Sequence, residues 1–204
     1  ITNHRIDKAL KPAAKSNDFE VNIISGGTVT EDVKPVNELS RTGWTASIAK
    51  SDGTSAKDAA ALLDENDTTD IDYYVGNALP YVVTIDLKEQ KEFKSFSLQK
   101  RQGNTNASWG VNGTVGAYEV QTSNDGTTWT AAGEGEFTKA DYNIHQVGNL
   151  YNVGDLVYAN FDTPQNARYV RLIQKSDVYG SQSFCMAEVR LYEDTYEKAV
   201  QEDS

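Results

Sequence analysis

The chain has 204 residues, a formal net charge of -11 at pH 7 and a single cysteine, Cys185. A chain of this length can bury roughly 70% of its unfolded surface in one domain, so it can form a core without disulfides. The acidic balance argues against nucleic acid and anionic membranes as partners, because both reward Lys and Arg.

The first 40 residues predict an extension rather than part of the main domain. A weak helical pattern in residues 1–16 is interrupted by Pro12, residues 19–25 alternate like a strand, and residues 28–39 are polar. We therefore expect a short N-terminal arm and connector at 1–40, a main domain at 41–193 and a polar C-terminal tail at 194–204.

An acidic loop follows a short apolar helical turn near Leu63. Five carboxylates of like charge are clustered in this loop: Asp64, Glu65, Asp67, Asp70 and Asp72. Such a loop either stays spread out in water or is held together by a hard cation. An EF-hand is excluded, because Thr69 stands where that loop needs Gly and Val75 where it needs Glu. Any calcium site here must take ligands from elsewhere in the chain, and a solvated acidic loop is the alternative.

Short runs with β-branched or aromatic residues and period-two alternation fill the chain after Trp44. The clearest are 81–87, 93–100, 117–123, 128–132, 156–163, 168–175 and 187–192. Asn124-Asp125-Gly126 predicts a hairpin turn between two of them. Helix is confined to a turn or two near residues 56–63. The pattern predicts an all-β protein, a β-sandwich or jelly roll.

Two loops are longer than a sheet connection requires. Residues 102–116 hold Trp109 among small polar residues, and residues 138–155 hold Tyr142, His145 and Tyr151. Long loops on a rigid sandwich often carry binding sites. Trp109 is either a stacking platform for a ligand or a plug folded under its own loop.

Several of these motifs, taken in order, resemble a known family. They are Trp44-Thr45-Ala46-Ser47, Leu63-Asp64 with Thr69, the run 84–87, Arg101-Gln102, the runs 118–129 and 167–172, and the run 187–192. The set is similar to the discoidin or coagulation factor type C domain, which includes galactose-binding-like carbohydrate modules of secreted and surface proteins. It covers about residues 43–193, and it implies a galactose-binding-like jelly-roll β-sandwich, in agreement with the strand pattern.

The resemblance also implies a structural calcium between the acidic loop and the last strand. Carried over residue by residue, its ligands would be Asp64, Asn66, Thr69, Ala187 and Glu188. The chain departs from the family at Glu65, where relatives usually have Gly.

Sugar-binding relatives use loops at one end of the sandwich. The matching positions, with Trp109 added, are Asp72, Tyr73, Tyr74, Arg101, Asn104, Asn106, Trp109, Tyr179 and Phe184. Two alternatives stay open: one of Tyr73 and Tyr74 fills the core, and Arg101 pairs with a carboxylate. No His lies near Tyr73, so galactose specificity is not carried over.

The expected function is a non-catalytic carbohydrate-binding module that takes a neutral glycan. We expect it at the cell surface or outside the cell, within or beside a larger glycan-handling protein. The alternative is an adhesion module with a protein or cell-surface partner, and a third reading is a spacer without ligand. The polar, acidic loops argue against membrane insertion. The acidic cluster could supply two carboxylates for glycoside hydrolysis, but nothing in the sequence marks one as an acid in an apolar pocket.

Overall fold

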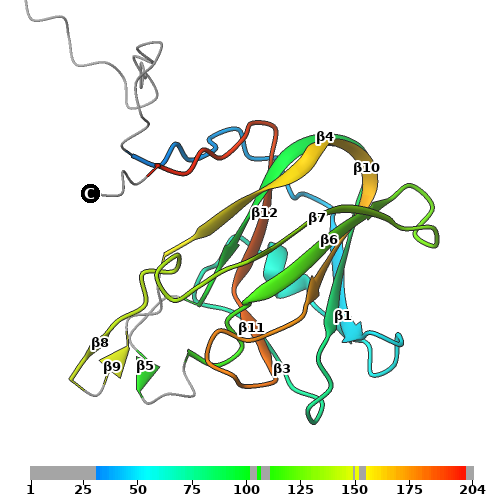
Figure 1. Ribbon diagram of the computed structural model, residues 1–204. Coiled ribbons are helices and arrows are strands. Elements are labelled where there is room, and N and C mark those ends of the chain that lie inside the picture. The colour runs from blue at the N-terminus through cyan, green and yellow to red at the C-terminus, as the bar shows by residue number, and fades with distance from the viewer. Residues whose placement is uncertain (1–30, 102–104, 107–110, 149, 152–154, 201–204) are drawn as a thin grey trace, which may run out of the picture.

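The computed structural model describes residues 31–101, 105–106, 111–148, 150–151 and 155–200 (Figure 1). It contains one 3-10 turn, η1 (Ala60–Leu63), and the following strands: β1 (Thr45–Lys50), β2 (Lys57–Asp58), β3 (Ile71–Tyr73), β4 (Tyr81–Gln99), β5 (Thr105–Asn106), β6 (Ala117–Ser123), β7 (Thr130–Glu136), β8 (Gln146–Val147), β9 (Leu150–Tyr151), β10 (Val157–Gln174), β11 (Phe184–Met186) and β12 (Glu188–Tyr192). The helix and strand expected before residue 30 lie outside the described residues.

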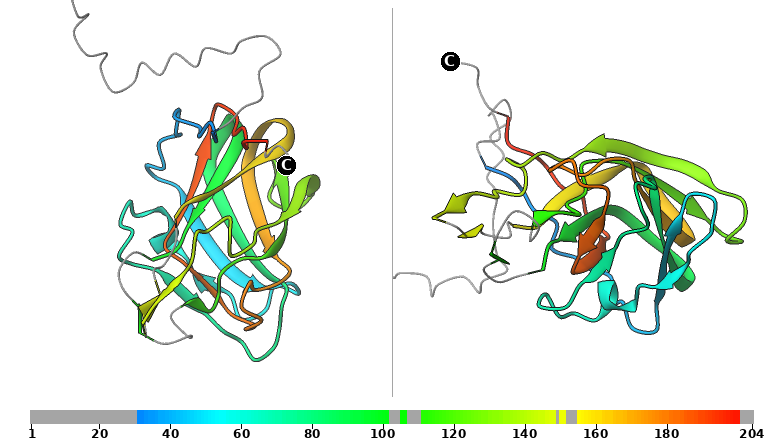
Figure 2. Two further views of the ribbon diagram at one scale, coloured as in Figure 1. Left: turned by 60° about the vertical axis from the view of Figure 1, so that its left-hand side comes forward. Right: turned by 90° about the horizontal axis from the view of Figure 1, so that it is seen from below.

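The main sheet runs in the order β2-β1-β4-β10-β6-β7, and β12 pairs with β4 outside this path. Its pairings are antiparallel. The first half of β4 pairs with β1, whereas its last five residues, 95–99, pair with β12. Figures 1 and 2 show β4 and β10 arching together, so that both strands contribute to both layers of a jelly-roll sandwich.

The two long strands replace four strands that the sequence predicts separately. In β4 the run from Lys88 to Lys91 is polar and looks like a connection, and in β10 the run around Pro164 does too. The structure keeps both runs in strand conformation, with a register shift between Asn160 and Gln165 that accommodates the bend. These residues are mostly exposed, because the curve carries them over the rim of the sandwich.

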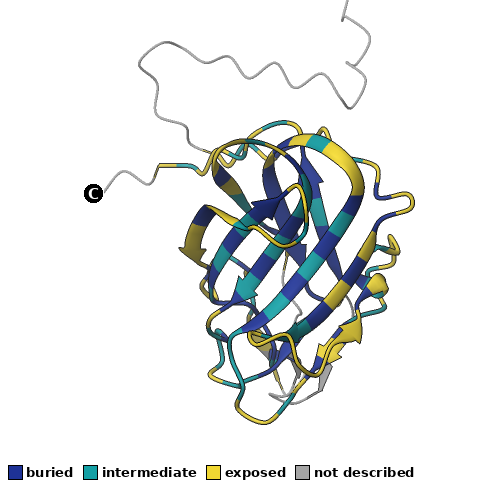
Figure 3. Ribbon diagram, turned by 90° about the vertical axis from the view of Figure 1, so that its right-hand side faces the viewer, coloured by how far each residue is buried: buried dark blue, intermediate teal, exposed yellow. Residues whose placement is uncertain are grey.

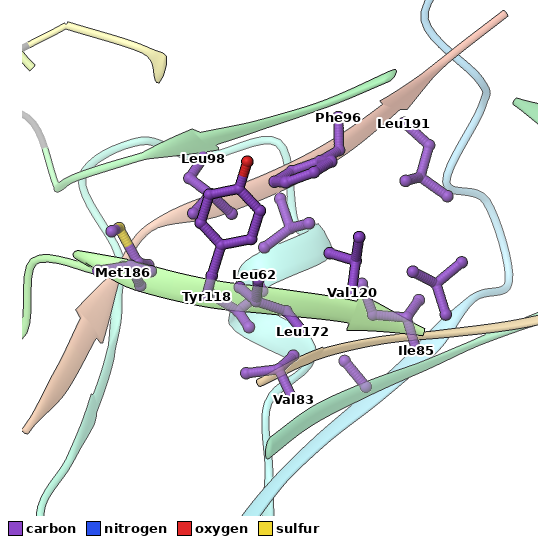
Figure 4. Close-up of a cluster of buried hydrophobic side chains, with 14 of the residues drawn as sticks. Leu62, Val83, Ile85, Phe96, Leu98, Tyr118, Val120, Leu172, Met186 and Leu191 are labelled. Carbon is purple, nitrogen blue, oxygen red and sulfur yellow. The ribbon is translucent and has the colours of Figure 1, made fainter. Parts of the chain in front are cut away.

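Alternating side chains build the core between the layers. Tyr81, Val83, Ile85 and Leu87 of β4 are buried, whereas the intervening residues are half-buried. This alternation appears as bands along the strands in Figure 3. Figure 4 shows where such side chains meet, with Tyr118 of β6 edge-on to Phe96 of β4 at a centroid distance of 5.5 Å. The predicted all-β jelly roll is confirmed.

The predicted hairpin turn joins β6 to β7. Gly126 takes a φ of +74°, which favours glycine. Asp125 accepts hydrogen bonds from the backbone N–H groups of Thr127 and Thr128, at 2.8 and 2.7 Å.

The segments on either side of the sandwich are hydrogen-bonded to one another. Val33 and Glu197 form an antiparallel bridge, and the N–H of Leu39 donates to the carbonyl of Leu191. The carboxylate of Asp194 accepts the N–H groups of Val36 and Asn37. Residues 31–40 and 193–199 therefore form one paired clasp on the domain, whereas the sequence predicts a connector that ends at residue 40 and a tail that begins at residue 194.

Candidate functional site

The acidic loop begins where η1 ends. Leu62 is buried against the core and fixes the turn, and the chain reverses at Glu65 with a φ of +60°. This left-handed conformation favours glycine, so a glutamate at this position carries some backbone strain. Glu65 tolerates the turn with its side chain exposed to solvent.

Oxygen atoms converge inside this loop. The hydroxyl of Thr69 lies 2.7 Å from Asp64 Oδ2 and 2.9 Å from the carbonyl oxygen of Asn66. That hydroxyl has one hydrogen and can donate fully to only one of them. The N–H of Asn66 is likewise shared, between Asp64 Oδ1 at 2.9 Å and Glu188 Oε1 at 3.0 Å. Two carboxylates from distant parts of the chain thus meet at one N–H.

Glu188, the first residue of β12, has no exposed surface. Its Oε2 accepts a hydrogen bond from Arg41 Nη1, and Arg190 Nη2 lies 3.8 Å from the same oxygen. Burial raises the pKa of Glu188, and Arg41 opposes that shift. For Asp64, burial acts in the raising direction but hydrogen bonds from Thr69 and Asn66 outweigh it, and the net effect lowers its pKa.

The donor set fits a hard cation. Asp64, Asn66, Thr69 and Glu188 lie together, and Ala187 precedes Glu188 in the chain. Within the described residues, no three side chains of His, Cys, Asp or Glu form a metal cluster. A bound ion would therefore use two carboxylates completed by hydroxyl and carbonyl oxygens, as calcium does.

The predicted ligand residues with solvent-facing side chains are Asp72, Tyr74 and Arg101. Tyr74 follows β3 and exposes 62% of its surface. Tyr179, in the loop before β11, is half-buried and lies under Lys139, whose Nζ is 4.3 Å from the ring centroid. β3 and β11 lie together at one end of the sandwich (Figure 1).

Two expected ligand contacts, Tyr73 and Phe184, are corrected by the structure. Tyr73 is 4% exposed, donates its hydroxyl to the carbonyl of Ser55 at 2.9 Å and packs edge-on against Tyr81. Phe184 is fully buried and lies opposite Tyr73 in the β3–β11 pair. Strand alternation turns Asp72 outward and Tyr73 inward. Of the two tyrosines, it is Tyr73 that fills the core.

Three other predicted positions receive little or no test. Asn104 and Trp109 lie outside the described residues. Asn106 lies in β5, opposite Leu150 of β9, and only its backbone is described. A ligand role for these residues stays a prediction.

Sequence reasoning missed two buried charges that hold the loops at this end. Lys100 Nζ donates to the carbonyls of Asn112 at 3.0 Å and Cys185 at 2.8 Å. Asp177 accepts the N–H groups of Gly113 and Tyr179 and the hydroxyl of Ser181. Burial lowers the pKa of Lys100 and raises that of Asp177. A charged residue at a strand end normally predicts a solvated position, so the sequence carries no signal for either role.

A third missed residue is Arg41, which contacts Glu188 across 147 positions of sequence. It stands at the predicted domain boundary, where an arginine reads as exposed. Its side chain is buried instead, because the clasp carries residues 31–40 back onto β12.

Comparison with known proteins identifies the family to which this fold belongs. The model of the F5/8 type C domain matches residues 44–189 of the chain. The chain belongs to this family. A curated relative, galactose oxidase from Gibberella zeae, is 26% identical to this F5/8 type C domain over 159 residues. The match covers 76% of the chain but 20% of the oxidase, so the chain spans about a fifth of that relative's length.

Solved structures share the fold. The module CpGH89CBM32-5 from Clostridium perfringens, in complex with GalNAc-β-1,3-galactose, is 21% identical with a TM-score of 0.58, and the match covers 76% of this chain and 99% of that one. The family 32 carbohydrate-binding module of C. perfringens NanJ, in complex with galactose, is 21% identical with a TM-score of 0.53, over 79% and 98% of the two chains. Both confirm the galactose-binding-like sandwich.

Proposed function

We propose that this F5/8 type C domain is a non-catalytic carbohydrate-binding module that takes neutral glycans at the loop end. The observation that carries this proposal is the display of Tyr74 beside Asp72. Among the described residues, the other large hydrophobic side chains exposed this far, Val36 and Val200, lie in the terminal segments. A solvent-facing ring next to planar polar groups is the arrangement that stacks on a sugar and bridges its hydroxyls.

The charge of the molecule selects among sugars. A net charge of -11, with Asp72 beside the ring, repels sialic and uronic acids, so neutral sugars are the expected class. The two solved modules described above, which share this fold, were each bound to a neutral sugar. We place the domain outside the cell or on its surface, within or beside a larger glycan-handling protein. In the described residues, no helix is both long and apolar enough to span a membrane.

The environment of Cys185, the single cysteine, does not support a catalytic role for its thiol. Burial raises the pKa of Cys185 to about 11, and its Sγ lies 3.4 Å from Asp70 Oδ2. Such a thiol is protonated at neutral pH and is a poor nucleophile.

A glycan array followed by titration tests the binding proposal. We expect one or more neutral glycans to bind, and we expect Tyr74→Ala and Arg101→Ala each to weaken the best hit about tenfold, the loss of one good contact. Val36→Ala is the matched control, because Val36 is 80% exposed in the clasp and should leave affinity unchanged. A flat array with capture of a protein partner would favour adhesion instead.

We also propose that calcium binds between Asp64 and Glu188 and shapes the acidic loop that leads into Asp72 and Tyr74. Its ligands would be the carboxylates of Asp64 and Glu188, the hydroxyl of Thr69 and the carbonyls of Asn66, Thr69 and Ala187. When bound, the ion would supply positive charge that holds these oxygens together. The support is the shared hydrogen of Thr69 and the two carboxylates at one N–H.

Thermal melting tests the ion. Extracellular modules bind calcium at about 10⁻⁴ to 10⁻³ M, so 10 mM calcium should raise the Tm over EDTA by about 3 to 10 °C. Asp64→Asn should remove this shift, whereas Asp52→Asn, a change to an exposed carboxylate in another loop, should keep it. Equal melting temperatures in calcium and EDTA would contradict the proposal.

A further inference from the structure

Arg41 lies outside the span that matches the family model, yet it reaches the acidic site. Its side chain lines a hollow of about 440 Å³ together with Glu38, Ser40, Glu65 and Arg190. The residue is 5% exposed. Arg41 Nη1 donates to Glu188 and lies 3.3 Å from the carbonyl of Leu62 and 3.5 Å from that of Val189.

The two oxygens of Glu188 have different surroundings. Oε2 faces the guanidinium groups of Arg41 and Arg190, whereas Oε1 faces the acidic loop through the N–H of Asn66. One carboxylate is thus divided between a cationic side and an oxygen-rich side. An ion among the loop oxygens could use Oε1 without displacing Arg41 from Oε2.

This division matters because a buried carboxylate must be compensated. An unpaired charge without solvent contact costs several kcal/mol, and removing the partner of a buried pair is strongly destabilising. Arg41 supplies that compensation from a chain segment that approaches from outside the family-matched span. Arg190 contributes less, since its Nη2 lies 3.8 Å from Glu188, while its Nη1 donates to Gln99 and its Nε lies 3.6 Å from Glu38.

We propose that Arg41 is a built-in counter-cation for Glu188 that keeps the acidic loop in place without calcium and lowers the domain's dependence on that ion. This inference rests on the calcium site proposed above. Arg41 and calcium both compensate Glu188, and they repel one another. Their effects on stability are therefore partly redundant, and by linkage each weakens the binding of the other.

The coupling can be measured on the full chain with Arg41→Gln. In EDTA we expect the variant to melt about 10 °C below the wild type, as for a broken buried pair. In saturating calcium we expect the deficit to shrink to less than half. Because saturating calcium can restore stability only by its difference in affinity for the two proteins, titration calorimetry should show calcium binding at least about tenfold more tightly to Arg41→Gln than to wild type.

Two variants separate charge from packing. Arg41→Lys retains the positive charge and should keep the calcium affinity near the wild-type value. Arg168→Gln removes one positive charge from the distant pair with Asp86 and should leave both the calcium affinity and the calcium shift unchanged. Equal deficits of Arg41→Gln in EDTA and in calcium would overturn the proposal, as would wild-type calcium affinity in that variant.

A variant that fails to fold is also informative. If Arg41→Gln is unfolded in EDTA, adding Glu188→Gln should restore folding, because the uncompensated charge is then removed. Failure of this double variant to recover would overturn the proposal. Calorimetry that shows no calcium binding to either wild type or Arg41→Gln would overturn it too. Glycan titrations in EDTA and calcium report separately on Tyr74, so loss of this inference leaves the sugar-binding proposal standing.

Discussion

Two carboxylate–arginine pairs in this domain share a chemistry and differ in burial. Glu188 and Arg41 have side chains that are 0% and 3% exposed, whereas Asp86 and Arg168 are 17% and 39% exposed. Arg168 grips Asp86 with two hydrogen bonds, at 2.9 and 3.1 Å. The pKa shifts go in opposite directions: hydrogen bonds from Arg168 lower the pKa of Asp86 strongly, and burial raises the pKa of Glu188.

The difference shows that the contribution of an ion pair to stability depends on how far its charges are buried. At the Asp86 pair, both side chains are partly exposed to water, which solvates the charges. Arg168 therefore adds a favourable interaction to a carboxylate that water already stabilises. At the Glu188 pair, the protein has removed water from both charges, and the arginine only offsets that cost. The exposed pair lies at the surface of the sheet, whereas the buried pair joins Arg41 to a carboxylate that also accepts the N–H of Asn66 in the acidic loop.

Breaking each pair gives the largest expected effect. Glu188→Ala removes the buried partner of Arg41 and leaves it only the partly exposed carboxylate of Glu38, 3.3 Å from its Nε, so it should lower the free energy of unfolding by about 3 kcal/mol. Asp86→Ala leaves Arg168 partly in water and should cost much less. Urea unfolding of both variants in EDTA checks this contrast, and equal losses would show that burial does not distinguish the pairs.

The pH dependence of stability should separate the pairs by sign. Asp86 has a folded pKa below its ordinary value near 3.8, so its contribution is present above about pH 4 and is lost as the pH falls further. Burial raises the folded pKa of Glu188 above its ordinary value of 4.5, so the folded state favours the protonated carboxyl group. The stability that this preference adds is present below pH 4.5 and is lost as the pH rises through the folded pKa.

Variants assign these slopes to their residues. Asp86→Asn should flatten the fall in Tm as the pH drops below 4. In EDTA, Glu188→Gln should flatten the part of the fall in Tm that occurs as the pH rises above 4.5. Melting curves collected from pH 2.5 to 7 provide the measurement. A Glu188→Gln profile parallel to the wild type over the upper range would contradict the assignment.

The sequence predicts features that depend on neighbouring residues and misses those that depend on distant ones. The alternation in residues 81–87 and the Asn124-Asp125-Gly126 turn are local signals, and local signals were enough for the sandwich. The acidic loop was visible as a cluster of neighbours. Arg41 was not, because its contact with Glu188 spans 147 positions and depends on the clasp between the two terminal segments.

The two tyrosines show the same limit at the ligand end. Asp72-Tyr73-Tyr74 carries an aromatic residue on each side of the strand, so composition alone does not say which ring faces solvent. The register of β3 against β11 decides it, by placing Tyr73 opposite the buried Phe184. That pairing joins residues more than 100 positions apart, and nothing in either segment specifies it alone.

Salt gives the smallest effect and the most direct reading of solvent access. At 1 M ionic strength the Debye length is about 3 Å, so charges in contact with water are screened and buried ones are screened far less. The Tm penalty of Asp86→Ala relative to wild type should therefore shrink when NaCl is raised from 0.05 to 1 M. The penalty of Glu188→Ala should stay nearly constant over the same range, because no solvent reaches its carboxylate. Each variant is compared with wild type at the same salt concentration, which removes general salt effects on the fold. If the Glu188→Ala penalty shrinks as much as that of Asp86→Ala, salt ions reach the Arg41–Glu188 pair in solution, although its side chains are only 3% and 0% exposed, and the proposed role of Arg41 as a buried counter-charge is contradicted.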